Sequence, residues 1–505
     1  MKLLKKHYIF ALLGIGVVAL YFFTRLYNLG LLPVFTDEAI YIRWSQIASN
    51  DATWRFISLT DGKQPMFVWI AMVLLKFIDD PLIAGRLVSV IAGFFSMIGM
   101  FFLGREVFKN IQIGLLASFL YVLYPFALVY DKLALYDSLV AMFIIWSLYF
   151  TFLLVRHIRL DIAMIFGIII GGGMLTKTSA NFGFLLLPFS LLLFPFKKNF
   201  NKNKLFKFAI FALTAVVIAN AMYAVLRLSP FFHIVEEKNL TFIYSFNEWI
   251  HQPFAFFFGN MKGLISWLIG YMTVPFLVLA LSSFFVSKKF LREKLLLLVW
   301  FIVPFAGLAF FGKVIYPRFI FFMTIPLLLL GTYSLYTLQS YAKIRAIKVL
   351  LLVVFAGMFV ITDYFLLTDF AKAQIPQSDR NQFIASWPAG GGVKETVIYL
   401  EKEAQNGKIY VATEGTFGLM PYALEMYLYD NPNVTIKGYW PIADTLPKEL
   451  LEASKTMPTY VVFYQPCPPC EGVGKAPIAW KLTKVFQLPK EESGVFYTLY
   501  KVTPQ

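Results

Sequence analysis

The sequence predicts an all-α polytopic membrane protein that ends in a small α/β domain. Its 505 residues are 59% hydrophobic and 18% aromatic, more apolar material than a water-soluble chain of this length carries. The apolar runs recur at ~20 residues, the length that crosses a hydrocarbon core of ~30 Å. From about residue 369 the composition becomes more polar, and helix and strand patterns alternate.

About eleven membrane spans are expected from these apolar runs. The first is basic and then apolar, but it is too long for a signal core and no small-residue cleavage site follows, so we expect an uncleaved span. With a cytoplasmic N-terminus, an odd number of spans places the C-terminus outside. The predicted spans lie near 7–27, 82–104, 111–130, 134–155, 161–176, 179–196, 205–226, 263–286, 293–311, 315–338 and 346–367.

The formal net charge of +16 does not indicate a nucleic-acid partner, because the basic residues fall in short clusters between apolar runs. These clusters are KLLKK at the N-terminus and the segments 197–207, 288–294 and 343–348. All fall on the cytoplasmic side of the predicted topology, as the positive-inside rule requires. We therefore predict a multi-pass protein of the plasma (cytoplasmic) membrane with no nucleic-acid partner.

Two domains are predicted: a transmembrane domain over 1–368 and a soluble extracytoplasmic α/β domain over 369–505. The transmembrane domain has two long outer loops, 28–81 and 228–262. The first contains PMFVWIAMVLLKFI, which is too short to span and is expected to be an interfacial helix. In the C-terminal domain, helices are expected at 393–405, 417–429 and 446–456, and strands at 408–413, 434–440, 459–465, 480–488 and 494–502.

The ionisable residues outside the cytoplasmic clusters map to the outer face of this topology. A proton- or ion-coupled transporter usually needs such groups near the bilayer midplane. The pattern instead indicates a site at the outer membrane–water interface, built from several loops. The residues are Asp37, Glu38, Lys63, Arg86, Asp131, Lys132, Asp137, Lys177, Arg227, Lys313 and Arg318.

This mixture of charges fits group transfer from a lipid phosphate. A carboxylate can take the proton of an acceptor hydroxyl or amine. Lysine and arginine can hold a phosphate and stabilise the negative charge of the leaving group. The residues therefore predict transfer from a lipid phosphate to a hydroxyl or amine outside the cytoplasm.

Over roughly residues 1–340 the sequence resembles the GT-C membrane glycosyltransferases, in the branch of protein O-mannosyltransferases and lipid A aminoarabinose transferases (glycosyltransferase family 39/83-like). The order of the matching pieces is more specific than any single piece. They are TDEAIY after the first span, KQPMFVW at 63–69, AGRLVSVIAGFFSMIGMFFLGREVF at 84–108, DKLALYDSLVAMF at 131–143, GGGMLTKTS at 171–179 and KVIYPRFIFFMTIP at 313–326.

The resemblance implies a GT-C fold and inverting transfer from a polyprenyl-phosphate sugar to a protein, lipid or glycan acceptor of the cell envelope. It places the catalytic base at Asp37, with Glu38 beside it, and a further functional acid at Asp137. Donor-phosphate contacts are implied for Lys63 in the Lys-x-Pro segment, for Lys177 and for Arg318. Arg86, at the outer end of the second span, is expected to join them.

The sequence departs from the aminoarabinose branch at two positions. Ile40 stands where that branch commonly has Arg, and Gly62 where it commonly has Glu. We therefore predict no required cofactor and assign no metal ligand, leaving a divalent metal open. His233 and His251 show no ligand-spaced motif and are expected to be loop residues.

Several of these features also have purely structural interpretations. Asp37, Glu38 and Asp137 could cap helices, and the basic residues could snorkel or contact lipid headgroups. CPPC at 467–470 has redox spacing, but it lies in a Pro-rich loop after a strand, so a structural disulfide or an idle pair is expected. GGG at 390–392 lacks a phosphate-loop lysine and is interpreted as a hinge. The alternative function is a transporter or flippase of lipid-linked glycans, which would not need Asp37.

Overall fold

The structure is a computed structural model that describes residues 2–194, 196 and 201–503. Residues 197–200 of the predicted basic cluster at 197–207 lie outside the described residues. The chain forms two compact units. The helical unit consists of Met1–Asn28, Phe56–Phe67 and Leu87–Pro376, and the α/β unit consists of Leu29–Arg55, Val68–Arg86 and Gln377–Gln505. The predicted domain boundary at 368/369 stays a prediction.

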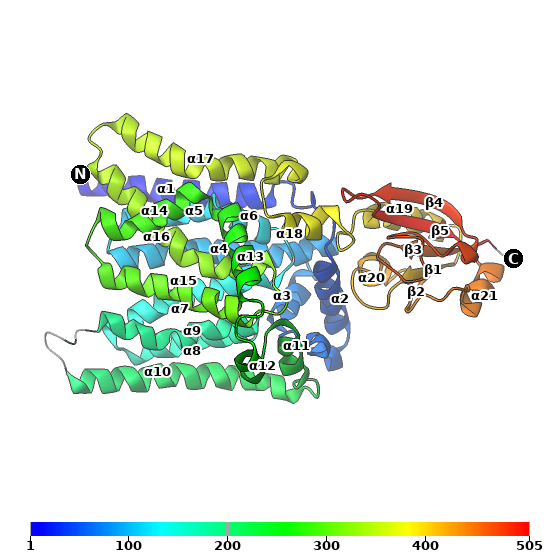
Figure 1. The fold of residues 1–505 in the computed structure, drawn as a ribbon, viewed down its shortest axis with the longest axis horizontal. Coiled ribbons are helices and arrows are strands. Elements are labelled where there is room, and N and C mark those ends of the chain that lie inside the picture. The colour runs from blue at the N-terminus through cyan, green and yellow to red at the C-terminus, as the bar shows by residue number, and fades with distance from the viewer. Residues whose placement is uncertain (1, 195, 197–200, 504–505) are drawn as a thin grey trace. The chain divides into compact units, whose positions relative to one another are not determined.

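The helical unit consists of long helices linked by short turns (Figure 1). Most of α4 belongs to it; the first residues of α4 belong to the α/β unit. The helices are α1 (Lys2–Leu26), α4 (Pro81–Phe108), α5 (Ile111–Val122), α6 (Pro125–Tyr130), α7 (Tyr136–His157), α8 (Leu160–Met174), α9 (Phe182–Leu185), α10 (Lys202–Tyr223), α11 (Ile234–Phe242), α12 (Phe246–His251), α13 (Phe257–Met272), α14 (Val274–Val286), α15 (Leu291–Phe311), α16 (Phe321–Tyr341) and α17 (Arg345–Thr368).

Seven helices of the described chain are long and apolar enough to cross a membrane, or eight if the bent pair α13–α14 counts as one span. The remaining predicted spans correspond to shorter apolar helices at 111–122, 160–174 and 178–193. The predicted count of eleven is therefore not confirmed, although a polytopic membrane protein is. The single span predicted over 263–286 consists of two helices that meet at 95°. Pro275 lies in the first turn of α14, where its missing N–H and fixed φ suit a new helix start.

Burial separates the inner helices of this unit from the outer ones. Of the most apolar stretch of α16, 89% is buried inside the protein, whereas the corresponding value for α1 and α10 is 17%. Since the sequence is apolar on all sides of these helices, the exposed faces of α1 and α10 are suited to lipid. The packed interior therefore centres on α16, which contacts α5, α7, α14 and α15.

The α/β unit contains one five-stranded sheet with the order β2-β1-β3-β5-β4. β1 pairs in parallel with β2 and β3, whereas β5 is antiparallel to both β3 and β4. β1 and β3 are buried along their whole length, which fits their largely apolar sequences, and the buried stretch of β1 includes Glu414 at its end. The elements are α2 (Thr36–Asn50), most of α3 (Met66–Leu74), α18 (Gln377–Arg380), α19 (Val393–Ala404), β1 (Ile409–Glu414), α20 (Tyr422–Leu428), β2 (Val434–Tyr439), α21 (Lys448–Thr456), β3 (Thr459–Phe463), β4 (Thr483–Pro489) and β5 (Phe496–Lys501). The predicted fold class, a helical membrane protein with a small C-terminal sheet, is confirmed.

Helix α2, from the first outer loop, packs within this unit against α20. Arg43 Nε lies 2.8 Å from Glu425 Oε2, and Gln46 Nε2 donates a 2.8 Å hydrogen bond to the carbonyl of Met426. A segment near the N-terminus of the chain is thus part of the same folded body as the C-terminal sheet.

Candidate active site

Asp37 lies in the first turn of α2 and is partly exposed. The helix begins after Phe35, whose extended backbone turns the chain into α2 and whose N–H donates a 2.9 Å hydrogen bond to Glu38 Oε2. Unpaired N–H groups at a helix N-terminus favour a carboxylate in the first turn. Asp37 therefore occupies a position that also suits a purely structural role, the one that the sequence left open for it.

Glu38, next to the predicted base, is fully buried in a two-bond ion pair with Arg86. Arg86 Nε and Nη2 each lie 2.9 Å from a different oxygen of Glu38. The other N–H groups of Arg86 donate to the carbonyls of Leu29, Leu32 and Pro33 at 2.8–3.0 Å. Because a guanidinium has five N–H donors and five acceptors surround it, phosphate binding by Arg86 would require this network to open.

The residue before Asp37 is held by the C-terminal part of the same unit. The N–H and Oγ1 of Thr36 donate hydrogen bonds of 3.2 and 2.9 Å to the carbonyl of Pro388, and Phe35 forms an antiparallel bridge with Ala389. Lys490 in turn donates to three carbonyls of the segment 386–389, those of Ser386, Trp387 and Ala389. The start of α2 is therefore fixed from a position more than 300 residues later in the chain.

In the helical unit, Asp137 and Lys177 form an ion pair. Asp137 is buried in the first turn of α7, and its Oδ1 lies 2.9 Å from Lys177 Nζ. Lys177 has an extended backbone at the turn that follows α8, and its side chain is 29% exposed. The structure thus brings together two residues that are 40 positions apart, and the lysine keeps a solvent-facing side.

Lys63 lies in a segment that is tied to the same turn. Gln64 Nε2 donates a 2.8 Å hydrogen bond to Thr178 Oγ1, and the N–H of Met66 donates to the carbonyl of Leu175 at 3.0 Å. Gly62, just before Lys63, has φ +67°, and a Cβ there would come within 2.7 Å of the carbonyl oxygen of Ile234. This local backbone has no room for a glutamate at position 62.

Three of the predicted phosphate-binding cations surround one pair of aromatic rings, Phe242 and Phe319, whose centroids are 6.0 Å apart. Lys63 Nζ lies 5.5 Å from the centre of the Phe242 ring, and Lys177 Nζ lies 4.6 Å from that of Phe319. The guanidinium of Arg318 lies 6.0 Å from the same Phe319 ring. Cations gathered in this way beside aromatic rings are suited to hold an anion.

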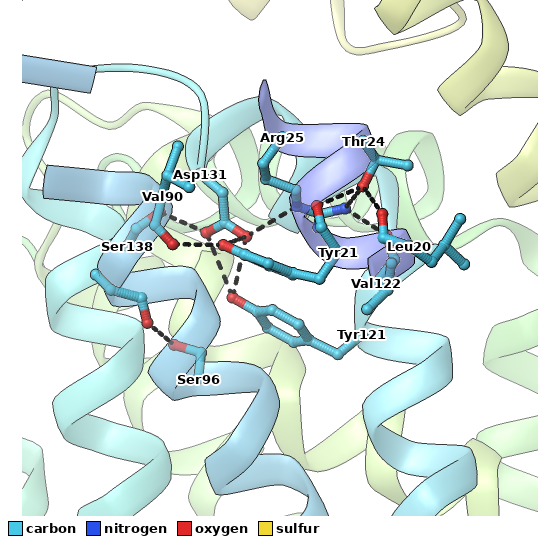
Figure 2. Close-up of polar contacts among 11 residues, drawn as sticks. Leu20, Tyr21, Thr24, Arg25, Val90, Ser96, Tyr121, Val122, Asp131 and Ser138 are labelled. Carbon is cyan, nitrogen blue, oxygen red and sulfur yellow. Dashed lines mark hydrogen bonds and ion pairs between the residues drawn. The ribbon is translucent and has the colours of Figure 1, made fainter. Parts of the chain in front are cut away.

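A buried polar network supports the turn before α7 (Figure 2). Figure 2 shows the side chains of Arg25, Tyr21, Tyr121 and Ser138 directed at the carboxylate of Asp131. Ser138 Oγ donates a 2.8 Å hydrogen bond to Asp131, and Arg25 Nε lies 3.4 Å from it. Asp131 therefore has a structural environment, in contrast with the partly exposed Lys177.

The seven predicted site residues thus fall into two groups. Asp37, Glu38 and Arg86 meet in the α/β unit, and Lys63, Asp137, Lys177 and Arg318 gather in the helical unit. His233 is exposed in the turn before α11, as expected, whereas His251 is the exposed last residue of α12 and not a loop residue. The two rings contact the backbone carbonyls of Pro230 and Asn247. The site's aromatic pair, Phe242 and Phe319, was not foreseen. The one available signal was the aromatic composition of the loop 228–262 and of the motif around Arg318.

The sequence model of a family described as dolichyl-phosphate-mannose-protein mannosyltransferase matches residues 62–223. This range contains Lys63, Asp137 and Lys177. No curated relative is found by sequence comparison.

Solved structures resemble this chain over nearly its whole length. ArnT from Cupriavidus metallidurans bound to undecaprenyl phosphate is 14% identical, with a TM-score of 0.60 and 98% of each chain covered. The same protein in its apo state is 12% identical, with a TM-score of 0.57, 100% of this chain and 99% of that chain covered. The Archaeoglobus fulgidus oligosaccharyltransferase tethered with an acceptor peptide is 12% identical, with a TM-score of 0.52, 90% of this chain and 69% of that chain covered.

These structural likenesses show an ArnT-like GT-C fold. The family match covers residues 62–223, a part of the chain that holds several of the motifs on which the resemblance was based. The resemblance expected from the sequence motifs is thereby confirmed.

Proposed function

We propose that this protein transfers a sugar from a polyprenyl-phosphate donor to an acceptor hydroxyl or amine, with inversion, at the outer face of the membrane. The cation cluster formed by Lys63, Lys177 and Arg318 is the main observation that supports this proposal. ArnT, whose fold this chain shares, has been solved with undecaprenyl phosphate bound, which supports a lipid phosphate as the anion.

The charge of the cluster suits the leaving group better than the donor. A polyprenyl-phosphate sugar is a phosphodiester with one negative charge. The polyprenyl phosphate released from it is a monoester whose second pKa is about 6, so it gains negative charge as the bond to the sugar breaks. The positive charges of the cluster therefore stabilise the transition state more than the bound donor. Asp137 directs the ammonium of Lys177 and limits the repulsion among the cations.

Asp37 is the general base of the proposed reaction. Its carboxylate takes the proton of the acceptor nucleophile, which attacks the anomeric carbon from the face opposite the phosphate. The carbon–oxygen bond to the phosphate breaks, and both electrons leave with the polyprenyl phosphate. One displacement inverts the anomeric centre. The ion pair between Glu38 and Arg86 positions the start of α2.

Sugar transfer in membranes from a labelled polyprenyl-phosphate sugar pool tests the proposal. Wild type is compared with Asp37→Asn, which keeps the shape of the side chain but cannot serve as the base. Asp79→Asn, an exposed position of the same unit, is the matched control. Lys177→Met tests the cation cluster, with the exposed Lys262→Met as its control. Parallel reactions with and without EDTA address the divalent metal.

We expect Asp37→Asn to lower the rate of transfer by 10² to 10⁴, the usual contribution of a general base, with an unchanged KM for the donor. Lys177→Met should lower kcat by about one to two orders of magnitude, the worth of a hydrogen bond between charged groups. The KM for the donor should rise less, because the cluster holds the leaving phosphate more tightly than the donor. Transfer by Asp37→Asn at the wild-type rate would refute the base assignment. If wild type transfers no sugar but still moves lipid-linked glycan across the membrane, the transporter interpretation replaces this one.

A further inference from the structure

The carboxyl ends of β1 and β3 form a second place where chemistry-bearing residues meet. The chain leaves β1 for β2 on one side of the sheet and returns to β3 on the other side. In open parallel sheets, this change of direction leaves a crevice beyond the carboxyl ends of the two strands. Glu414 is the last residue of β1, and the sequence CPPC at 467–470 follows β3.

Glu414 is a fully buried carboxyl, and only one of its two oxygens accepts hydrogen bonds. Its Oε2 accepts hydrogen bonds from the N–H groups of Tyr464 and Gln465, at 2.8 and 3.0 Å. Its Oε1 has no hydrogen-bond partner among the described residues. A buried oxygen without a hydrogen bond costs about 1–3 kcal/mol of folding free energy. A carboxyl that served stability alone is therefore not expected at this position. Burial also raises the pKa of Glu414 to about 7.

Two sulfur atoms lie close to this carboxyl. Cys467 and Cys470 form a disulfide, and a Glu414 oxygen and the two sulfurs all lie within 4.8 Å of one another. Cys467 is 8% exposed and packs in the core of the sheet, whereas Cys470 is partly exposed. The other titratable group that faces the carboxyl is the buried hydroxyl of Tyr464.

This disulfide contributes little as a cross-link. It joins residues three positions apart in one loop, and the stabilisation from closing a loop grows with loop length, so it is near its minimum here. The C-x-x-C spacing is also that of exchange-active pairs. The sequence argued against a reactive pair because CPPC is not at a helix start. A helix start would stabilise the thiolate of the leaving sulfur, whereas a buried protonated carboxyl beside the sulfurs can instead give that sulfur a proton.

We propose that Cys467 and Cys470 are a redox-active pair that exchanges with a partner dithiol, and that Glu414 donates and accepts the proton of the inner sulfur. This inference does not rest on the proposed glycosyl transfer.

The exchange proceeds in two displacements. A thiolate of the partner attacks Sγ of the accessible Cys470, the disulfide breaks, and Sγ of Cys467 leaves with the electron pair and takes the proton of Glu414. The second partner thiolate then attacks the partner's own sulfur in the mixed disulfide. Cys470 leaves as a thiolate and takes a proton from water. The partner becomes a disulfide, two electrons reach the cysteine pair, and the Glu414 carboxylate regains its proton from water.

Reduction of the purified full-length protein by dithiothreitol, in EDTA and without denaturant, tests this proposal. Samples are quenched with acid, and free thiols are counted by mass after alkylation. Rates are measured from pH 5.5 to 8.5 and divided by the concentration of dithiothreitol thiolate. Wild type is compared with Glu414→Gln, which can still accept the two backbone hydrogen bonds. The matched control is Glu452→Gln, an exposed position on α21.

In wild type we expect the normalised rate to fall as pH rises through about 7, as Glu414 loses its proton. Below that pH, Glu414→Gln should be reduced at least about tenfold more slowly, with a flat profile, while Glu452→Gln matches wild type. A pair that resists reduction until the protein is unfolded would show a structural disulfide and overturn the proposal. A flat wild-type profile would overturn the role of Glu414, whether or not Glu414→Gln folds.

Discussion

At the scale of single residues, the ion pair between Glu38 and Arg86 shows charged side chains that hold a loop in place. Both side chains are fully buried, and together they hold the loop that leads into α2. Arg86 had been predicted to bind phosphate because it lies at the outer end of a span, and that role stays a prediction. The five acceptors around its guanidinium favour the positioning role instead.

Replacing Arg86 by Met should destabilise the α/β unit by about 3–5 kcal/mol, because it leaves the Glu38 charge buried without a partner. The double variant Glu38→Gln/Arg86→Met should recover part of that loss. Thermal unfolding in detergent, followed by limited proteolysis of the unit, measures both. A variant with wild-type stability and a raised KM for the donor would instead place Arg86 on the phosphate.

Glu414 should make the stability of the α/β unit depend on pH. Its pKa is raised from 4.5 to about 7, so the folded state binds more protons than the unfolded state between these values. The stability that Glu414 contributes therefore falls as pH rises from about 4.5 to 7, by at most about 3 kcal/mol, and is constant outside that window. Glu414→Gln should remove this component. Urea unfolding of the disulfide-bonded protein at pH 5 and pH 8 checks this prediction, and an equal pH dependence in the variant would contradict it.

The sequence alone identified the members of the cation cluster but not what gathers them. Lys63, Lys177 and Arg318 were predicted from motif positions in three different loops. Phe242 and Phe319 are themselves uncharged, and aromatic residues are 18% of this chain, so these two rings do not stand out. Arg25 and Asp131 pair across 106 positions, a contact that no local pattern encodes.

At the scale of elements, the segment 386–389 links the C-terminal sheet to the start of α2. Lys490 follows β4, and its ammonium gathers three carbonyls of this segment, while Pro388 accepts two hydrogen bonds from Thr36. One side chain therefore supports the turn on which the position of Asp37 depends.

Lys490→Met should leave three partly buried carbonyls without their donor and cost about 2–3 kcal/mol. Hydrogen exchange at the amides of residues 35–39 should accelerate, while exchange in α16 stays unchanged. Transfer should lose kcat with little change in the KM for the donor, since the cation cluster is intact. The exposed Lys481→Met on the preceding turn is the control. Unchanged exchange at 35–39 would show that the segment does not need Lys490.

Secondary structure was predicted well where one pattern covers one element. All five strands and the helices α19 and α21 of the C-terminal sheet appear within a few residues of the expected positions. The bend within the span predicted over 263–286 was not expected, because a hydropathy window measures length and not direction. Pro275, near the middle of this apolar run, was the available warning.

At the scale of the whole molecule, the distribution of charge predicts a cytoplasmic N-terminus and an extracytoplasmic C-terminus. The chain has two cysteines, so replacing both by Ser gives a background for single introduced cysteines. Cysteine at Lys343 should be labelled by an impermeant maleimide only after the membrane is opened, and cysteine at Asp444 in intact cells. Labelling of both from the same side would show that the charge clusters do not set this topology.

The grouping of α2 with the C-terminal sheet could not be read from the sequence. Composition changes near residue 369, and that change suggested a boundary there, but contacts such as Arg43 with Glu425 join residues 382 positions apart. Hydropathy and periodicity describe neighbours along the chain. They carry no information about which distant surfaces pack together.

The α/β unit is assembled from three separate stretches of the chain, and this has a consequence for engineering. A truncation at residue 368 would not remove a dispensable module, because it would leave α2 without the strands, the Pro388 carbonyl and the Glu425 carboxylate that hold it. A chimaera that exchanges substrate preference between relatives needs to transplant 29–55, 68–86 and 377–505 together. Homologous C-terminal regions grafted alone should yield inactive or misfolded hybrids, whereas three-piece grafts should fold.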